Sequence, residues 1–247
     1  MACLLYSYAH PDDESFLVAG TSCLYSRQGV TIVLATATLG QKGRRGEPAL
    51  CSRRELPEVR RKELEEARQL LGIGHVEVFG YQDKELDQAP AEDMRERLTA
   101  LIRRWRPQVV CTFDPHGLNR HPDHIAISRF TADALSAAAD PRYRADLGAS
   151  HRVQRLLWTP FEPPWEFPEP EPPWPRRPGA DFILDIREFA QQKEAALKAH
   201  RTQWPSIQRC FFPEDEKGER LSAEVFRQAW GPEVPERPCD DLFAGIG

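Results

Sequence analysis

The strongest constraint on the fold is the order of sequence patterns in the first 36 residues. Residues 4–9 form a short apolar run, residues 15–27 carry apolar side chains at helical spacing, and residues 30–36 are apolar and rich in β-branched side chains. Strand, helix and strand in this order make a βαβ unit, and the two strands of such a unit lie parallel in one sheet. We therefore expect an α/β fold.

The same alternation continues along the chain. It predicts further strands over residues 76–79, 109–113, 153–158 and 182–186 and helices over 57–71, 93–105, 125–139 and 188–200. The tail over 221–247 has a mixed pattern that predicts no element. These patterns indicate a Rossmann-like, mostly parallel sheet with helices on both faces, in a single domain over residues 1–247.

Residues 160–178 interrupt the pattern. They hold nine of the 22 prolines of the chain, and proline at this density excludes a helix or a central strand. We expect an extended loop or a flap over the edge of the sheet. Its tryptophans, Trp165 and Trp174, either line a substrate entrance or pack locally, and local packing is the simpler interpretation.

Composition excludes several classes of protein. Hydrophobic residues make up 40% of the chain, as in globular proteins, and a net charge of −5 disfavours a nucleic-acid partner. The sequence shows neither a signal peptide nor a run long enough to span a membrane, so no membrane partner is expected. The six cysteines lack the spacing of a zinc ribbon or a redox motif, which indicates reduced thiols and a cytoplasmic protein. A homo-oligomer is compatible with all of this.

Two short motifs carry most of the chemical information. Residues 10–14 read His-Pro-Asp-Asp-Glu and follow the first apolar run, while residues 121–124 read His-Pro-Asp-His and follow the run over 109–113. Because the carboxyl ends of parallel strands share one edge of a sheet, we expect the two motifs to converge. Two imidazoles and one carboxylate suffice for a divalent metal, with an aspartate and a histidine left for proton chemistry. This ligand set favours Zn²⁺, and Fe²⁺ is compatible with it.

Each motif also has a simpler interpretation. Asp12 or Asp13 alone would serve as a cap for the helix that follows, and the histidines of residues 121–124 would suit a polar surface turn. Neither interpretation explains two such motifs at equivalent positions of the fold. The metal interpretation is therefore favoured by about tenfold.

The two motifs resemble those of the LmbE/PIG-L family of zinc-dependent N-deacetylases, which act on N-acetylglucosamine conjugates and related amides. Weaker matches over residues 59–72, 80–83, 193–203 and 241–245 extend the resemblance over nearly the whole chain. The resemblance implies a metal-dependent amide hydrolase. Such an enzyme would remove an N-acyl group, most often acetyl, from an N-acetylglucosamine-type small molecule by attack of water activated at the metal.

The resemblance also implies roles for individual residues. The metal ligands would be His10, Asp13 and His124. Asp12 would be the general base that takes a proton from the attacking water. His121 would face the substrate carbonyl and, when protonated, stabilise the oxyanion, while Asp123 would orient His121 and raise its pKa.

Four further residues are candidates for substrate binding. By resemblance, Arg60 would contact an anionic or hydroxyl-rich part of the substrate and Asp83 would lie near the sugar. Asn119 stands where mycothiol-type members of the family often have a tyrosine, which suggests a different acyl or leaving group. Arg120 would suit a carboxylate or a phosphate. The basic segment over 39–62 is either an electropositive lip for an anionic substrate or, for most of its charges, a solvated surface.

Two alternatives stay open. The same site would serve an amidase of a thiol conjugate or of another small amide. A non-catalytic module that binds sugars or nucleotides with a metal is the other alternative, and Asp12 speaks against it because a metal carrier has no need of a base beside the metal.

Overall fold

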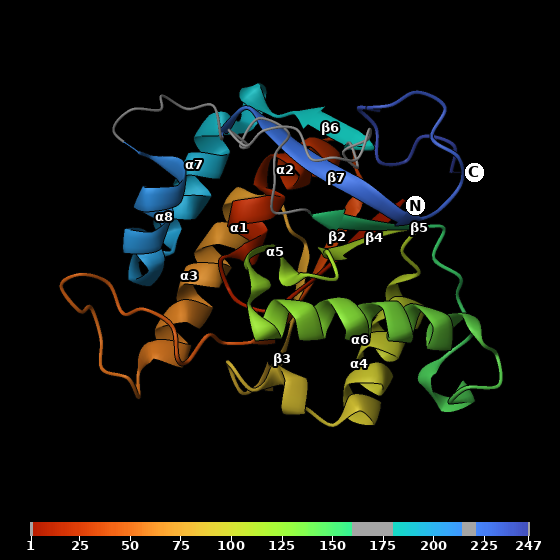
Figure 1. The fold of residues 1–247 in the computed structure, drawn as a ribbon, viewed down its shortest axis with the longest axis horizontal. Helices are drawn as coiled ribbons and strands as arrows, with labels where there is room; N and C mark the ends of the chain where they lie inside the picture. The colour runs from red at the N-terminus through yellow and green to blue at the C-terminus, as the bar shows by residue number, and fades with distance from the viewer. Residues whose placement is uncertain (1, 160–179, 214–220, 247) are drawn as a thin grey trace, which may run out of the picture.

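A computed structural model of the chain describes residues 2–159, 180–213 and 221–246. Within them, a seven-stranded sheet crosses the molecule and helices pack against it (Figure 1). The segment over 160–178, predicted to be a loop or a flap, lies outside the described residues.

The sheet is parallel except at one edge. Its strands are β1 (Cys3–Tyr8), β2 (Thr31–Thr38), β3 (His75–Tyr81), β4 (Val109–Phe113), β5 (Arg155–Thr159), β6 (Phe182–Asp185) and β7 (Ala223–Trp230). Their order across the sheet is β3-β2-β1-β4-β5-β7-β6. The first five strands in this order run parallel, and β7 runs antiparallel to both of its neighbours. The prediction of a mostly parallel, Rossmann-like sheet is confirmed.

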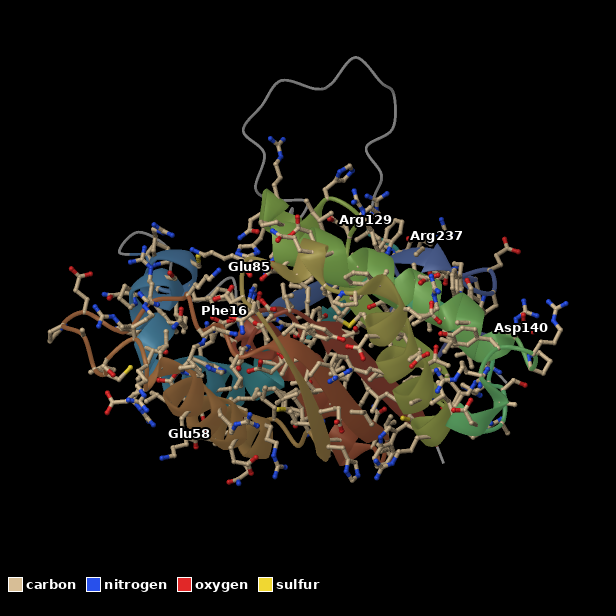
Figure 2. The ribbon with its side chains drawn as sticks, turned by 90° about the horizontal axis from the view of Figure 1, so that it is seen from below. Phe16, Glu58, Glu85, Arg129, Asp140 and Arg237 are labelled. Atoms are coloured by element: carbon tan, nitrogen blue, oxygen red, sulfur yellow. The ribbon has the colours of Figure 1, made fainter. Side chains whose placement is uncertain are left out.

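Helices cover both faces of this sheet. They are α1 (Asp13–Leu17), α2 (Ala19–Arg27), α3 (Leu56–Leu70), α4 (Ala91–Trp105), α5 (Gly117–Arg120), α6 (Pro122–Ala139), α7 (Ala190–Ala199) and α8 (Trp204–Phe211). Helices α2, α3 and α7 gather on one face, and α4 and α6 pack together on the other (Figures 1 and 2). All six residues of β1 are buried, because this strand lies inside the sheet and is covered from both sides. Burial on both faces explains why the strand is a continuous apolar run.

The structure differs from the predicted elements in four places. The helix predicted over 15–27 is broken at Val18, whose φ of −139° turns the chain between α1 and α2. Helices α5 and α8 were not predicted. Strand β7 lies in the tail where no element was expected, because Glu224 interrupts its apolar pattern; that carboxylate is buried in an ion pair with Lys193 of α7.

Candidate metal centre

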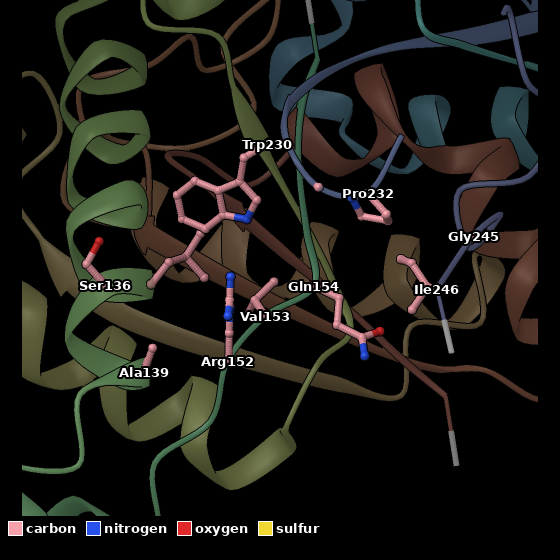
Figure 3. Close-up of a pocket in the computed structure, with 11 residues that line it drawn as sticks. Ser136, Ala139, Arg152, Val153, Gln154, Trp230, Pro232, Gly245 and Ile246 are labelled. Carbon is pink, nitrogen blue, oxygen red and sulfur yellow. The ribbon is translucent and has the colours of Figure 1, made fainter. Parts of the chain in front are cut away.

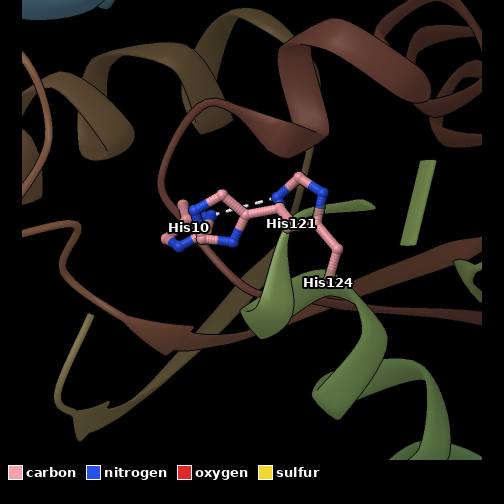
Figure 4. Close-up of side chains that lie close together, drawn as sticks. All are labelled: His10, His121 and His124. Atoms are coloured by element: carbon pink, nitrogen blue, oxygen red, sulfur yellow. Dashed lines mark hydrogen bonds between the residues drawn. The ribbon is translucent and has the colours of Figure 1, made fainter. Parts of the chain in front are cut away.

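The two motifs meet at one edge of the sheet. Strands β1 and β4 are parallel neighbours, so the loops that follow Tyr8 and Phe113 leave the sheet side by side. His10 and His124 are 114 positions apart in sequence, yet Nδ1 of the first is 3.2 Å from Nε2 of the second (Figure 4). Helix α6 starts directly at the second motif, with His121 as its N-cap. The predicted convergence is confirmed.

Three side chains, His10, Asp13 and His124, meet at this edge, and we call them the donor triangle. Nδ1 of His10 lies 3.2 Å from Nε2 of His124 and 3.7 Å from Oδ2 of Asp13, whereas the other oxygen of Asp13, Oδ1, lies 3.6 Å from Nε2 of His124. A tetrahedral zinc with ligands at 2.0–2.2 Å places them about 3.3–3.6 Å apart. The two histidine nitrogens are therefore spaced for a zinc-sized cation, Asp13 lies near each of them with a different oxygen, and all three residues are buried.

The backbone holds Asp13 in place. Its Oδ2 accepts hydrogen bonds from the N–H groups of Ala9 at 3.1 Å and His10 at 2.7 Å, which leaves Oδ1 facing His124. Burial, assisted by the charge of Asp12, raises the pKa of Asp13 to about 7. A carboxylate that is this costly to ionise gains most from a bound cation.

His124 presents one particular nitrogen to the triangle. Its Nδ1 donates to the backbone carbonyl of Gly117 at 3.2 Å, so Nε2 carries the free lone pair. The ring stacks on Phe113 with centroids 3.9 Å apart. Burial and the neighbouring His10 lower the pKa of His124 well below its usual value. The ring is neutral, which is the form that binds metals.

Two carboxylates hold the far side of His10. Its Nε2 lies 3.1 Å from Oδ2 of Asp123 and 3.2 Å from Oδ1 of Asp83. Burial lowers the pKa of His10, but the hydrogen bonds to Asp123 and Asp83 outweigh it and raise the pKa to about 10. Backbone N–H groups of Lys84 and Leu86 fix Asp123 in turn. A metal-binding histidine typically has such an outer carboxylate partner.

Asp123 and Asp83 thus have contacts that the sequence did not indicate. The carboxylate of Asp123 contacts His10 rather than His121; only its backbone N–H reaches His121, donating to Nδ1 at 3.2 Å. Burial and the charge of His10 lower the pKa of His121, although Asp123 opposes this. The expected rise in the pKa of His121 is therefore not found. With Nδ1 as the acceptor, the neutral ring carries its proton on Nε2.

The ring of His121 also lies beside the triangle. Its centroid is 4.8 Å from those of both His10 and His124, and the three rings each bring a nitrogen within 4.8 Å of the others (Figure 4). A second combination of possible ligands joins His10 with Asp83 and Asp123. Both alternatives share His10 with the triangle, so every combination centres on the same edge of the sheet.

Asp12 lies next to the triangle and is held by Arg60. Oδ2 of Asp12 is 3.0 Å from Nη2 of Arg60, and the guanidinium also donates to the carbonyls of Pro11 and Gly40. Arg60 is only 3% exposed. Gly40 makes this position possible, because a Cβ there would lie 1.7 Å from Nη1 of Arg60. Burial raises the pKa of Asp12, while Arg60 and His200 oppose the rise.

The remaining predicted residues lie in the short helix α5, directly before α6. Asn119 is exposed, and its Oδ1 accepts the backbone N–H of His121 at 3.1 Å. Arg120 is exposed and has a left-handed backbone, with φ at 64°. Contacts of Asn119, Arg120, Arg60 and Asp83 with a substrate stay predictions.

A hollow of about 880 Å³ lies between the C-terminal half of α6, the start of β5 and the end of β7 (Figure 3). Its walls include Ser136 and Ala139 from the C-terminal half of α6, Arg152 before β5, and Trp230 at the end of β7. These residues lie near the ends of the sheet where β5 begins and the antiparallel β7 finishes. The metal ligands converge at the other ends of the parallel strands, where α6 starts. The hollow is therefore separate from the candidate metal centre.

Comparison with known proteins assigns the chain to a family. The family model described as "PIG-L: GlcNAc-PI de-N-acetylase" matches residues 5–135, more than half of the chain. The chain belongs to the PIG-L family. Within the described residues, this PIG-L protein has no helix long and apolar enough to cross a membrane.

Relatives match this PIG-L protein over nearly the whole of both chains. The 1D-myo-inositol 2-acetamido-2-deoxy-alpha-D-glucopyranoside deacetylase of Rhodococcus jostii is 32% identical over 99% of this chain and 98% of its own. The mycothiol S-conjugate amidase of Streptomyces coelicolor is 30% identical over 98% of this chain and 97% of its own. A conserved protein from Thermus thermophilus has a similar crystal structure, with a TM-score of 0.71, 28% identity and coverage of 94% and 97%. The expected resemblance and the α/β fold are both confirmed.

Proposed function

We propose that this protein is a metal-dependent hydrolase that removes an N-acyl group, acetyl first of all, from a small molecule of the N-acetylglucosamine type. The observation that carries the proposal is the triangle of donor atoms with the carboxylate of Asp12 beside it. Deacetylase relatives that match nearly the whole chain support the choice of substrate.

In this proposal His10, Asp13 and His124 hold the metal, and the metal is zinc. The spacing of their donor atoms supports this set, as does the outer hydrogen bond that each histidine makes. His121 is the weaker candidate, because its Nδ1 already caps α6. A bound Zn²⁺ supplies Lewis-acid activation of water and of the substrate carbonyl.

The side chains around the metal perform the proton chemistry. Asp12 is 17% exposed at its side chain, so it can reach solvent from a mostly buried position and accept a proton from the attacking water. It then returns that proton to the departing amine. Nε2–H of His121 donates a hydrogen bond to the carbonyl oxygen as negative charge develops there. This role works with a neutral imidazole, in keeping with the lowered pKa of His121.

A thiol-conjugate amidase is the second candidate. It is supported by the amidase relative, which is as well covered as the deacetylases. We also propose a cytoplasmic location, in line with six cysteines that form no disulfide.

Metal analysis joined to an amine-release assay tests the proposal. We expect about one zinc per chain and release of a primary amine from N-acyl glucosamines, with acetyl preferred; a preference for bulky acyl groups would favour the amidase. Asp12→Ala should keep the metal and abolish turnover, since Asp12 is not a ligand. A protein that holds metal but releases no amine from any N-acyl sugar would contradict the deacetylase proposal.

A further inference from the structure

Besides the pair of Asp12 with Arg60, a second buried ion pair joins Glu14 of the first motif to His200. Both side chains are 0% exposed. Oε1 of Glu14 accepts a hydrogen bond from Nε2 of His200 at 2.7 Å, although the two residues are 186 positions apart. Neither residue belongs to the donor triangle.

Glu14 connects this pair to the backbone of Asp12. Its Oε2 accepts the N–H of Asp12 at 3.0 Å, and its Oε1 also accepts the hydroxyl of Ser15 at 2.7 Å. Both oxygens of Glu14 are thereby occupied inside the protein. Because Glu14 is fully buried as well, it has no route to a substrate, and its contacts point to a role that acts through Asp12.

Asp12 needs such support because its backbone is strained. Its φ is 120° and its ψ is −29°, a conformation that favours glycine and that other residues keep only where their surroundings enforce it. The N–H that Glu14 accepts belongs to this strained residue. On the other side, Arg60 holds the carboxylate. The base is therefore fixed at two points, its backbone by Glu14 and its side chain by Arg60.

His200 is itself firmly anchored at the end of α7. Its backbone N–H bonds to the carbonyl of Leu197, and the next residue, Arg201, starts a short 3-10 turn. Thr202 in that turn bonds through both its N–H and its hydroxyl to Glu63 of α3. Nδ1 of His200 is buried and has no hydrogen-bond partner among the described residues, so Glu14 is the only polar contact of the ring there.

We propose that His200 and Glu14 are positioning residues that hold Asp12 in the strained conformation from which it acts as the base. The assignment rests on the proposed function of Asp12. His200, in the C-terminal half of the chain, donates a hydrogen bond that fixes the carboxylate of Glu14. Glu14 in turn accepts the N–H of Asp12 and so fixes its backbone. The backbone conformation then sets the direction of the Asp12 carboxylate. The pair neither binds the metal nor touches the substrate.

Variants of His200 test the proposal with a matched control. His200→Ala and His200→Asn remove the contact with Glu14, the second because its side chain is too short, whereas His200→Gln keeps a donor near the position of Nε2. The control is Lys193→Met on the same helix, which breaks another fully buried ion pair, with Glu224, away from Asp12. It should lower Tm and leave kcat unchanged.

The kinetic outcome separates positioning from general stability. A displacement of the base by the order of 1 Å lowers kcat by about 100-fold, so we expect this loss in His200→Ala and His200→Asn, with KM and zinc content unchanged. His200→Gln should recover most of kcat. The proposal is overturned if His200→Ala turns over like Lys193→Met at a temperature where both are folded, or if it loses its zinc.

Crystal structures provide a readout that needs no substrate. In His200→Ala, or in His200→Asn if the alanine variant does not fold, φ of Asp12 should leave the left-handed region; in Lys193→Met it should stay there. An unchanged Asp12 in the His200 variants would overturn the positioning role. Absence of turnover by the parent protein would overturn the function proposed for Asp12 instead, and the two failures are thus distinguishable.

Discussion

Replacing Gly40 by alanine tests how Arg60 holds Asp12 without altering either residue. Both Gly40 and Gly29 have positive φ, 59° and 81°, so an alanine costs about 1–2 kcal/mol in backbone strain at either position. A Cβ at Gly29 meets nothing within 4 Å, whereas at Gly40 it would lie 1.7 Å from Nη1 of Arg60. Gly40→Ala must therefore expel the guanidinium, while Gly29→Ala is the matched control.

The loss of the buried ion pair between Asp12 and Arg60 determines how far the Tm should fall. Removing the partner of a buried charge costs about 3–5 kcal/mol, and we take about 3 kcal/mol because the side chain of Asp12 is 17% exposed. For a chain of 247 residues, about 2–4 °C in Tm per kcal/mol places the Tm of Gly40→Ala about 6–12 °C below that of Gly29→Ala. The turnover number should fall in Gly40→Ala alone, because Asp12 loses its anchor.

Differential scanning calorimetry and the amine-release assay on the two variants measure these differences. KM should change less than kcat, since Arg60 is buried and its Nη1 and Nη2 contact protein acceptors. Equal Tm and equal kcat in the two variants would refute the anchoring of Asp12 by Arg60. A rise in KM alone would instead support the substrate contact that the family resemblance implies for Arg60.

Three further predictions concern the metal centre. Asp123→Asn and Asp83→Asn should each weaken zinc binding by about 10–100-fold, measured by competition with a chelating dye, because they remove the outer partners of His10; unchanged affinity would contradict that role. His121→Ala should lower kcat by about 10²–10³ with zinc retained, as for loss of one oxyanion donor, and a loss of zinc would make His121 a ligand. In the metal-free protein the pKa of His10 is raised to about 10, so its protonation stabilises the fold fully below about pH 6.5 and this contribution is lost as pH rises toward 10. The Tm of the metal-free protein should fall over this range, and a constant Tm would contradict the pairing of His10 with the two carboxylates.

The sequence predicted the sheet well because its central parallel strands, β1, β2 and β4, are largely buried. The apolar runs that became β1 and β4 needed no partner to be recognised, and their parallel pairing brought the two motifs together. Strand β7 could not be predicted in the same way. Its Glu224 looks like a surface residue until Lys193, 31 positions away in sequence, neutralises it inside the protein.

The candidate site, too, could be predicted only where its residues stand in recognisable motifs. The residues of the donor triangle were recognisable because two of them share a motif and the third stands in a second one. The outer contacts join residues that are distant in sequence: Asp83 and Asp123 reach His10, and His200 reaches Glu14. Glu14 stands inside the first motif, yet its sequence neighbours do not show that its carboxylate folds back onto the N–H of Asp12.

Anomalous diffraction at the zinc absorption edge tests the central claim most directly. Crystals of the protein loaded with zinc should show a single strong peak about 2.0–2.2 Å from Nδ1 of His10, Nε2 of His124 and a carboxylate oxygen of Asp13. A peak between Nε2 of His10 and the carboxylates of Asp83 and Asp123, or no peak at this edge of the sheet, would contradict it.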